Sequence, residues 1–171
     1  MALGQHCAVL QIVGYQNSGK TTLMEKLIIA ATAEGARVAT IKHHGHGGAP
    51  TAVNRKDSQR HEQAGAIVAG VEGAGTLFLT IQQASWKLKE LVELYQQFQP
   101  DLILVEGYKN EDYPKVVLIR HQEDVASLKK LTNIICVLYW QDVDPSTFTC
   151  PVYPIKQEDL YLNLLLEKVR N

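Results

Sequence analysis

The sequence has few of the features that mark secreted, membrane-spanning or zinc-binding proteins. Its 171 residues include three cysteines, an odd number, and no two have the Cys-x-x-Cys spacing. A disulfide framework and a zinc knuckle are therefore not expected, and reduced thiols are typical of the cytosol. No stretch of about 18 consecutive apolar residues is present, which argues against a membrane span. The first residues contain no basic segment of a signal peptide, so we expect a cytoplasmic protein.

An excess of charge of either sign is also missing. Seventeen Lys and Arg residues balance 18 Asp and Glu residues, which gives a formal net charge of -1. No overall field attracts the chain to nucleic acid or to an anionic membrane, and we expect neither as a partner. Hydrophobic residues make up 46% and charged residues 20%, as in ordinary globular domains.

Short apolar runs alternate with helical patterns along the chain. The patterns predict strands at residues 7–13, 37–41, 66–71, 76–80, 102–105, 116–119 and 134–138, and helices at 20–34, 85–98 and 157–169. The first βαβ unit predicts that strands 7–13 and 37–41 form a parallel pair. Residues 66–80 predict a hairpin. The inward-facing side chains are expected to be Leu88, Leu91, Tyr95 and Phe98 in the second helix and Leu160, Leu164 and Leu165 in the last.

A glycine-rich segment separates the first strand from the first helix. Residues 14–21 read Gly-Tyr-Gln-Asn-Ser-Gly-Lys-Thr and match G-x-x-x-x-G-K-[ST] at every defined position. Backbone N–H groups of such a loop bind phosphates, the lysine reaches the β- and γ-phosphates, and the hydroxyl binds Mg²⁺. We expect the phosphates on Gly14, Asn17, Ser18, Gly19, Lys20, Thr21 and Thr22. The chain is thus predicted to be an α/β protein with a P-loop NTPase-like three-layer fold, a mainly parallel sheet and a single domain over residues 1–171.

Glu106 ends the most apolar predicted strand, at the sheet edge where the phosphate loop must also lie. P-loop proteins use an acidic residue at such a place to hold Mg²⁺ or its water. Thr21 and Glu106 are therefore the predicted metal ligands, with a solvated strand-end carboxylate as the alternative for Glu106. Glu72 has the same Val-Glu-Gly neighbours but lies in an Ala/Gly turn, which favours a solvated role.

Basic residues and histidines cluster between residues 37 and 61. This segment contains five Lys and Arg residues but a single acidic residue, Asp57. His43, His44 and His46 lie within four positions of the sequence. Three interpretations remain open: an anion-binding loop, a solvated basic loop and a transition-metal site. The anion-binding interpretation makes Lys42, His43 and Lys56 candidate ligand-binding residues.

The residues alone do not identify the base. No Asn-Lys-x-Asp tetrapeptide is present, so the argument from the motif ends at a nucleoside triphosphate with Mg²⁺. No Gln follows Glu106 to orient a water molecule, which predicts slow intrinsic hydrolysis.

Three blocks together resemble the molybdopterin-guanine dinucleotide biosynthesis protein B (MobB) family. They are residues 13–23, residues 41–46 with 56–60 and 64–66, and residues 104–109. The resemblance implies a GTP-binding accessory factor with weak Mg²⁺-dependent GTPase activity, active as a homodimer. It further implies association with the guanylyltransferase (MobA-type) that joins GMP to molybdopterin, with molybdopterin as a possible ligand. Carried over by position, Asp57 would lie near the metal or the γ-phosphate.

Two other functions remain as alternatives. One is a P-loop kinase or a dethiobiotin-synthetase-like ligase that acts on a small acceptor. The other is a metal-carrying chaperone that uses His43, His44 and His46.

Overall fold

The computed structural model describes residues 7–44 and 56–170, which form two compact units. The larger unit comprises Met1–Gly45 with Leu88–Asn171, and the smaller comprises His46–Lys87. The prediction of one domain over residues 1–171 stays a prediction. In the described part of the chain, no helix combines the length and the apolar character that crossing a bilayer requires.

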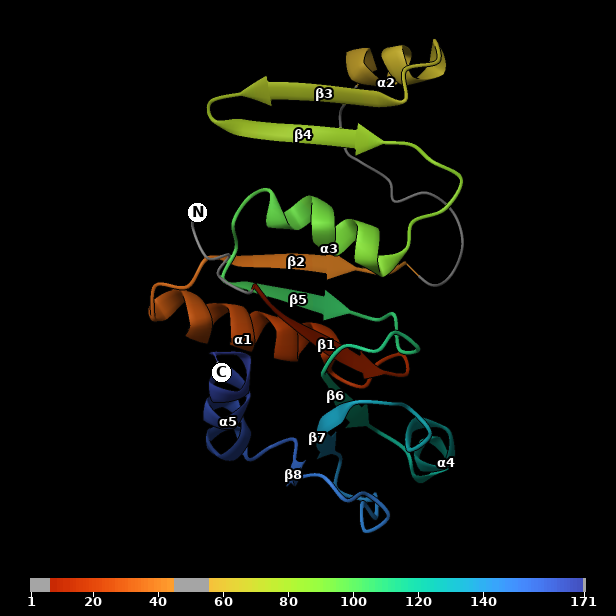
Figure 1. Cartoon of the computed structure of the whole chain (residues 1–171). Coiled ribbons are helices and arrows are strands. Elements are labelled where there is room, and N and C mark those ends of the chain that lie inside the picture. The colour runs from red at the N-terminus through yellow and green to blue at the C-terminus, as the bar shows by residue number, and fades with distance from the viewer. Residues whose placement is uncertain (1–6, 45–55, 171) are drawn as a thin grey trace. The chain divides into compact units, whose positions relative to one another are not determined.

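The larger unit is built on a six-stranded parallel sheet (Figure 1). Its elements, in chain order, are β1 (Ala8–Gly14), α1 (Lys20–Ala33), β2 (Val38–Lys42), α3 (Leu88–Gln96), β5 (Leu102–Glu106), β6 (Lys115–Ile119), the short 3-10 helix η1 (Gln122–Asp124), α4 (Val125–Leu128), β7 (Ile134–Tyr139), β8 (Val152–Pro154) and α5 (Glu158–Arg170). The strand order is β2-β5-β1-β6-β7-β8.

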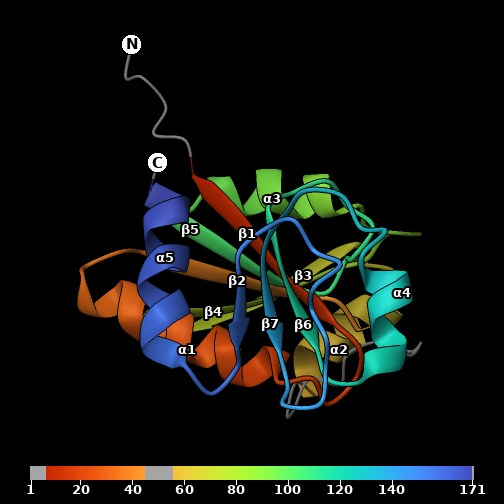
Figure 2. The same ribbon diagram turned by 90° about the horizontal axis from the view of Figure 1, so that it is seen from below.

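Side chains alternate across the sheet and build a core on each face, which gives three layers (Figure 2). Leu10 and Ile12 of β1 pack with α1 and α5, whereas Val13 packs with α4 on the opposite face. The residues of β5 alternate likewise, because Leu104 joins the α1 side and Ile103 the α3 side. Central parallel strands that are covered on both faces account for the continuous apolar runs in the sequence. The predicted three-layer α/β fold is confirmed.

One expected strand pairing is wrong. β1 and β2 are parallel, but they are not neighbours, because β5 lies between them. β5 pairs with β2 from Val38↔Leu102 to Lys42↔Glu106 and with β1 from Ala8↔Leu102 to Ile12↔Glu106. A βαβ sequence pattern fixes the relative direction of two strands but leaves room for a third between them. The inserted strand brings Glu106 next to β1.

Two predicted inward-facing residues are exposed. Phe98 lies beyond the end of α3 and is 60% exposed, and Leu160 in the first turn of α5 is 54% exposed. Val92 and Tyr161 are buried instead. Both misplacements occur at helix ends, where the pattern no longer follows the face that packs on the sheet.

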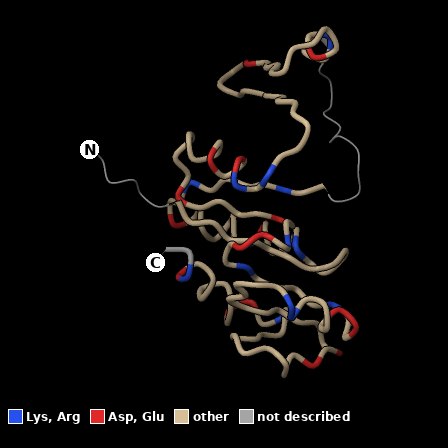
Figure 3. The backbone as a smooth tube through the Cα atoms, turned by 45° about the vertical axis from the view of Figure 1, so that its right-hand side comes forward, with Lys and Arg blue, Asp and Glu red and all other residues tan. Residues whose placement is uncertain are grey.

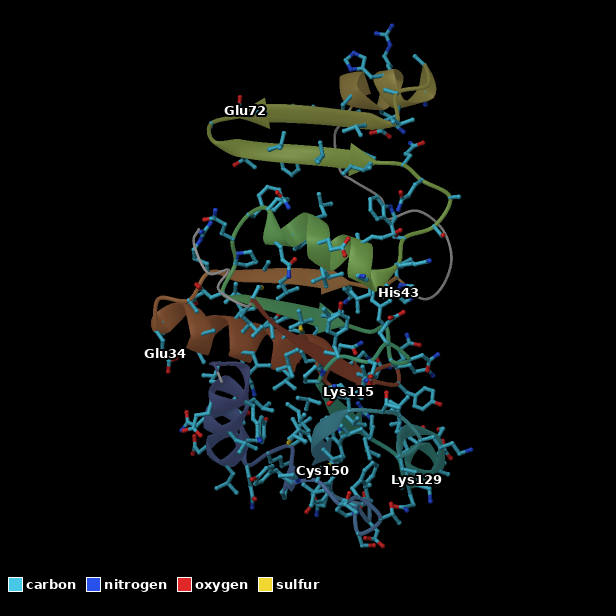
Figure 4. All side chains as sticks on the ribbon, in the orientation of Figure 1. Glu34, His43, Glu72, Lys115, Lys129 and Cys150 are labelled. Atoms are coloured by element: carbon cyan, nitrogen blue, oxygen red, sulfur yellow. The ribbon has the colours of Figure 1, made fainter. Side chains whose placement is uncertain are left out.

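Two buried polar side chains fix the segment between β5 and β6. The Gln11 amide donates to the carbonyl oxygens of Gly107 and Tyr108, at 3.1 and 2.7 Å, and accepts from the Tyr113 N–H at 3.3 Å. The Lys115 ammonium, labelled in Figure 4, donates to the carbonyl oxygens of Glu111 and Thr132. Burial lowers the pKa of Lys115, and the nearby carboxylates of Asp112 and Glu111 oppose that shift. These bonds give the segment that follows Glu106 a defined backbone path.

The smaller unit contains α2 (Lys56–Gln63), β3 (Val68–Gly73) and β4 (Thr76–Ile81). The two strands form the predicted antiparallel hairpin, with pairs from Val68↔Ile81 to Gly73↔Thr76. Ala74 and Gly75 connect them, both with positive φ, as a tight two-residue hairpin turn requires. Many apolar side chains of this hairpin are exposed.

Candidate functional site

The phosphate-binding motif forms the turn between β1 and α1. Gly14 ends β1 with φ +154°, and a Cβ there would lie 2.6 Å from the Leu118 carbonyl oxygen, so only glycine fits. Gly19 precedes α1 in the left-handed region, with φ 99°, and no side chain caps the helix. The N–H groups of the first helical turn have no acceptor within the helix and point along its axis. The turn therefore has the backbone that the sequence predicts for an anion cradle.

Lys20 folds back over this turn. Its ammonium donates to the Tyr15 carbonyl oxygen at 2.6 Å. Burial lowers the pKa of Lys20, the Glu106 carboxylate opposes the shift, and the Lys42 ammonium adds to it. A phosphate bound to the backbone N–H groups of the turn would add negative charge next to the Lys20 ammonium. Of the residues that the structure describes, the Glu106 carboxylate alone opposes the lowering of its pKa.

Thr21 and Glu106 meet although 85 residues separate them in sequence. The Thr21 hydroxyl lies 3.2 Å from Oε2 and 3.4 Å from Oε1 of Glu106. The Glu106 side chain is only 11% exposed, because β5 delivers it between β1 and β2. The fold thus brings together the two residues that the sequence predicts as metal ligands.

Lys42, at the end of β2, supplies a cation to the same pair. Its ammonium lies 3.2 Å from Oε1 of Glu106 and 3.5 Å from the Thr21 hydroxyl. A positive group therefore already faces one carboxylate and one hydroxyl oxygen. Hard oxygen donors of this kind suit Mg²⁺, which usually takes few protein ligands and completes its shell with water and phosphate.

His43, labelled in Figure 4, directly follows β2. Its backbone N–H donates to the Glu106 carbonyl oxygen at 2.9 Å, and its ring lies 4.4 Å from the Tyr108 ring, centre to centre. Gly107 makes this contact possible, since a Cβ there would lie 3.0 Å from Cβ of His43. His43 therefore lies at the edge of the site, packed against an aromatic ring.

The remaining predicted residues divide between the two units. Asn17 and Thr22 are exposed in the phosphate turn and its helix, whereas Ser18 is buried there. Lys56 and Asp57 lie in α2 of the smaller unit, and their side chains, like all of His46, fall outside the described residues. Among the described residues, no group of three or more His, Cys, Asp and Glu side chains is arranged to hold a metal ion.

Sequence reasoning missed a second set of contacts to the phosphate turn. Arg120 donates to the Asn17 carbonyl oxygen, and the Trp140 indole N–H donates to the Ser18 carbonyl oxygen at 3.1 Å. On another side, Tyr15 bonds Ser127 at 3.1 Å between their hydroxyl oxygens, and the Lys109 ammonium lies 4.9 Å from the Tyr15 ring centre. Arg120 and Trp140 each follow a parallel strand, so the strand-end rule that singled out Glu106 could have found them.

Comparison with known proteins gives a consistent family. The model of the family described as "Molybdopterin guanine dinucleotide synthesis protein B" (MobB) matches residues 9–140. A Bacillus subtilis (strain 168) protein named "Probable molybdopterin-guanine dinucleotide biosynthesis adapter protein" is 46% identical over 140 residues, which are 81% of this chain and 80% of that protein. The Escherichia coli (strain K12) "Molybdopterin-guanine dinucleotide biosynthesis adapter protein" is 37% identical over 117 residues, covering 66% of this chain and 65% of that protein.

Solved structures agree with the sequence comparisons. The crystal structure of Bacillus subtilis MobB has 38% identity and a TM-score of 0.83, and the match covers 94% of this chain and 97% of that one. The chain therefore belongs to the MobB family.

Proposed function

We propose that this protein is a GTP-binding adapter for the guanylation of molybdopterin in molybdopterin guanine dinucleotide biosynthesis, with weak Mg²⁺-dependent GTPase activity. The observation that carries the proposal is the meeting of Thr21, Glu106 and Lys42 beside the phosphate turn. The names of the relatives supply the pathway. Guanine, the expected base, follows from the family.

In this proposal the phosphates bind to the turn from Gly14 to Thr22, with Lys20 at the β- and γ-phosphates. The Thr21 hydroxyl and the Glu106 carboxylate would hold Mg²⁺, which would supply positive charge to the phosphates. Lys42 would then be available to pair with the terminal phosphate, because a cation held at Glu106 would neutralise that carboxylate. His43 and Lys56 are proposed to bind the ligand, and Asp57 to lie near the metal or the γ-phosphate.

Hydrolysis is expected to be slow, because no glutamine follows Glu106 in the sequence to orient a water molecule. Gly107 follows Glu106, and the next side chain, Tyr108, packs against His43. P-loop proteins without a water-positioning side chain and a supplied arginine turn over slowly. A slow GTPase suits an adapter, whose nucleotide-bound form must persist long enough to meet its partner.

The proposed partners are a MobA-type guanylyltransferase, a second copy of this chain and molybdopterin as ligand. The hairpin of the smaller unit supports the homodimer. Val68, Leu77 and Leu79 project from one side of β3 and β4 and are 49%, 55% and 42% exposed. Exposed apolar side chains gathered on a small sheet mark interaction surfaces.

Calorimetry with a panel of nucleoside triphosphates, with and without Mg²⁺ and the guanylyltransferase, tests the proposal. We expect GTP binding that strengthens with Mg²⁺ and responds to the partner. Glu106→Gln should abolish the Mg²⁺ effect, because the variant loses its anionic metal ligand. Glu72→Gln is the matched control, since Glu72 has the same Val-Glu-Gly neighbours but lies in the hairpin.

Two results would contradict the proposal. Mg²⁺ dependence that survives in Glu106→Gln would remove the metal site. Turnover that rises steeply with a small-molecule acceptor, and not with the guanylyltransferase, would favour the kinase or ligase instead.

A further inference from the structure

The carboxyl edge of the parallel sheet carries two groups of side chains, one on each side of β1. Thr21, Glu106 and Lys42 lie toward β5 and β2. On the other side, Arg120 follows β6, Trp140 follows β7 and Ile155 follows β8. The proposed function assigns the first group to the binding of a metal and the terminal phosphates. It assigns no role to the second group.

The Trp140 ring is fixed against the phosphate turn. Its indole N–H donates to the Ser18 carbonyl oxygen, and the Arg120 guanidinium carbon lies 5.0 Å from the ring centre. Arg120 in turn donates to the Asn17 carbonyl oxygen. A Cβ placed on Gly19 would lie 3.9 Å from the Trp140 ring and 3.3 Å from the Ile155 side chain, so both side chains border the start of α1.

This aromatic ring is not part of the buried core. Trp140 is partly exposed and Arg120 is exposed, although β6 is buried throughout and β7 is buried in its middle. The indole lies beside the phosphate turn, where a hydrogen bond and the Arg120 cation hold it. It therefore offers a flat and rigid surface to a ligand. Nucleobases stack on aromatic rings and on guanidinium planes.

The direction of the nucleotide follows from the phosphate chemistry. The metal and Lys20 select the β- and γ-phosphates, so the terminal phosphate points toward Thr21 and Glu106. The α-phosphate and the nucleoside must then leave the turn on the opposite side of β1. That side is the one where Arg120 and Trp140 lie.

We propose that Trp140 and Arg120 form the stacking platform for the base of the bound nucleotide. The inference rests on the proposed nucleotide-binding function and adds the position of the base. Every base has a π-face, so the platform strengthens binding of purine nucleotides without selecting guanine. The choice of guanine then has to come from hydrogen bonds to the base edge.

Intrinsic fluorescence gives a direct test, because the chain has two tryptophans, Trp86 and Trp140. In Trp86→Phe the emission comes from Trp140 alone, and a purine stacked on the indole should quench it. We expect GTP and ATP with Mg²⁺ to quench this emission, and inorganic tripolyphosphate with Mg²⁺ to leave it nearly unchanged. Trp140→Phe, which retains only Trp86, is the matched control and should show no quenching.

Binding constants give the second arm. Trp140→Leu should weaken GTP and ATP binding by about 5- to 150-fold, the range for loss of one stacked base, and leave tripolyphosphate binding nearly unchanged. Trp140→Phe keeps a ring but loses the bond to Ser18, so it should retain most of the affinity. This variant also keeps the test valid if the leucine variant does not fold.

The outcomes separate the platform from the site itself. Equal losses for GTP and tripolyphosphate in Trp140→Leu would overturn the platform, because Trp140 would then act only by shaping the phosphate turn. Equal quenching by tripolyphosphate and GTP would overturn it as well. If tripolyphosphate and GTP both fail to bind the unaltered protein, the proposed function falls together with the platform.

Discussion

Lys20 is the residue on which the binding of a triphosphate most depends. Its ammonium lies against the Tyr15 carbonyl oxygen, and burial lowers its pKa. We predict that Lys20→Ala weakens GTP binding by about 2–5 kcal/mol, because the phosphate oxygens lose a charged, hydrogen-bonded partner. Isothermal titration in the presence of Mg²⁺ measures the change.

Lys26→Ala is the control for this prediction. Lys26 also lies on α1, but it pairs with Glu158 of α5, and its removal should leave GTP affinity unchanged. An unaltered dissociation constant in Lys20→Ala would mean that the phosphates bind elsewhere.

At the level of single residues, the sequence identified residues that belong to a motif or end an apolar strand. It missed residues whose role depends on their neighbours in the folded sheet. Gly14, Gly19 and Lys20 stand at fixed spacings, and Glu106 ends a clearly apolar strand, so all four were predictable. Arg120 and Trp140 belong to no motif. The strand-end rule makes them candidates, but only the strand order shows that they lie on the side of β1 opposite Glu106. Gln11 reads as an interruption in an apolar strand, and only the folded structure gives its amide three backbone partners.

The hairpin of β3 and β4 exposes apolar side chains on one face. Leu77 and Leu79 lie on one face with Val68, and all three are exposed. We predict that Leu77→Ser with Leu79→Ser converts the proposed homodimer to a monomer, because association would then remove less apolar area from water. Analytical ultracentrifugation measures the change in mass.

Ile29→Ser gives a comparison, since Ile29 is an exposed apolar residue, 68% exposed, on α1 of the larger unit. This variant should keep the oligomeric state of the unaltered protein. A serine-substituted hairpin that still forms dimers would assign the dimer contact to another surface.

The elements themselves were largely predictable, but their neighbours were not. Apolar runs bounded by glycine or proline marked β1, β2, β5, β6 and β7 to within about two residues. The insertion of β5 between β1 and β2 leaves no local trace, because it is decided by the packing of the whole sheet. The exposure of Phe98 and Leu160 was missed because helical periodicity carries no information about where a helix leaves its supporting surface.

For the molecule as a whole, positive and negative charges nearly balance. Basic and acidic residues are interspersed along the described backbone (Figure 3), in line with the formal net charge of -1. The pH dependence of stability is therefore expected to come from individual buried groups rather than from overall repulsion.

Tyr161 is the buried group that lends itself best to measurement. Burial, with a contribution from the Glu158 carboxylate, raises its pKa from 10.0 to about 12. The unfolded chain then loses the phenolic proton at lower pH than the folded one, so the stabilisation is complete below pH 10.0 and is lost as the pH rises toward about 12. The free energy of unfolding should fall by about 1.4 kcal/mol per pH unit in that window on account of this group.

Tyr161→Phe tests this prediction by urea unfolding at several pH values. At neutral pH the variant should be less stable by about 1 kcal/mol, because the hydroxyl no longer donates to the Ile155 carbonyl oxygen. In the alkaline window the difference should shrink and then reverse. A constant difference across the window would show that Tyr161 titrates normally. Burial also raises the pKa of Cys136 to about 12, and the Cys136 thiolate contributes to the raised pKa of Tyr161, so both proteins are compared in a Cys136→Ala background.

The position of β1 at the middle of the sheet has a consequence for how the chain is made. Both of its hydrogen-bonded neighbours, Leu102–Glu106 and Lys115–Ile119, belong to the second half of the sequence. A ribosome that has finished the first hundred residues has therefore produced the nucleotide loop without either strand that supports it. The loop should acquire its shape only late in synthesis, and a nascent chain released before that point would expose a largely apolar strand to aggregation.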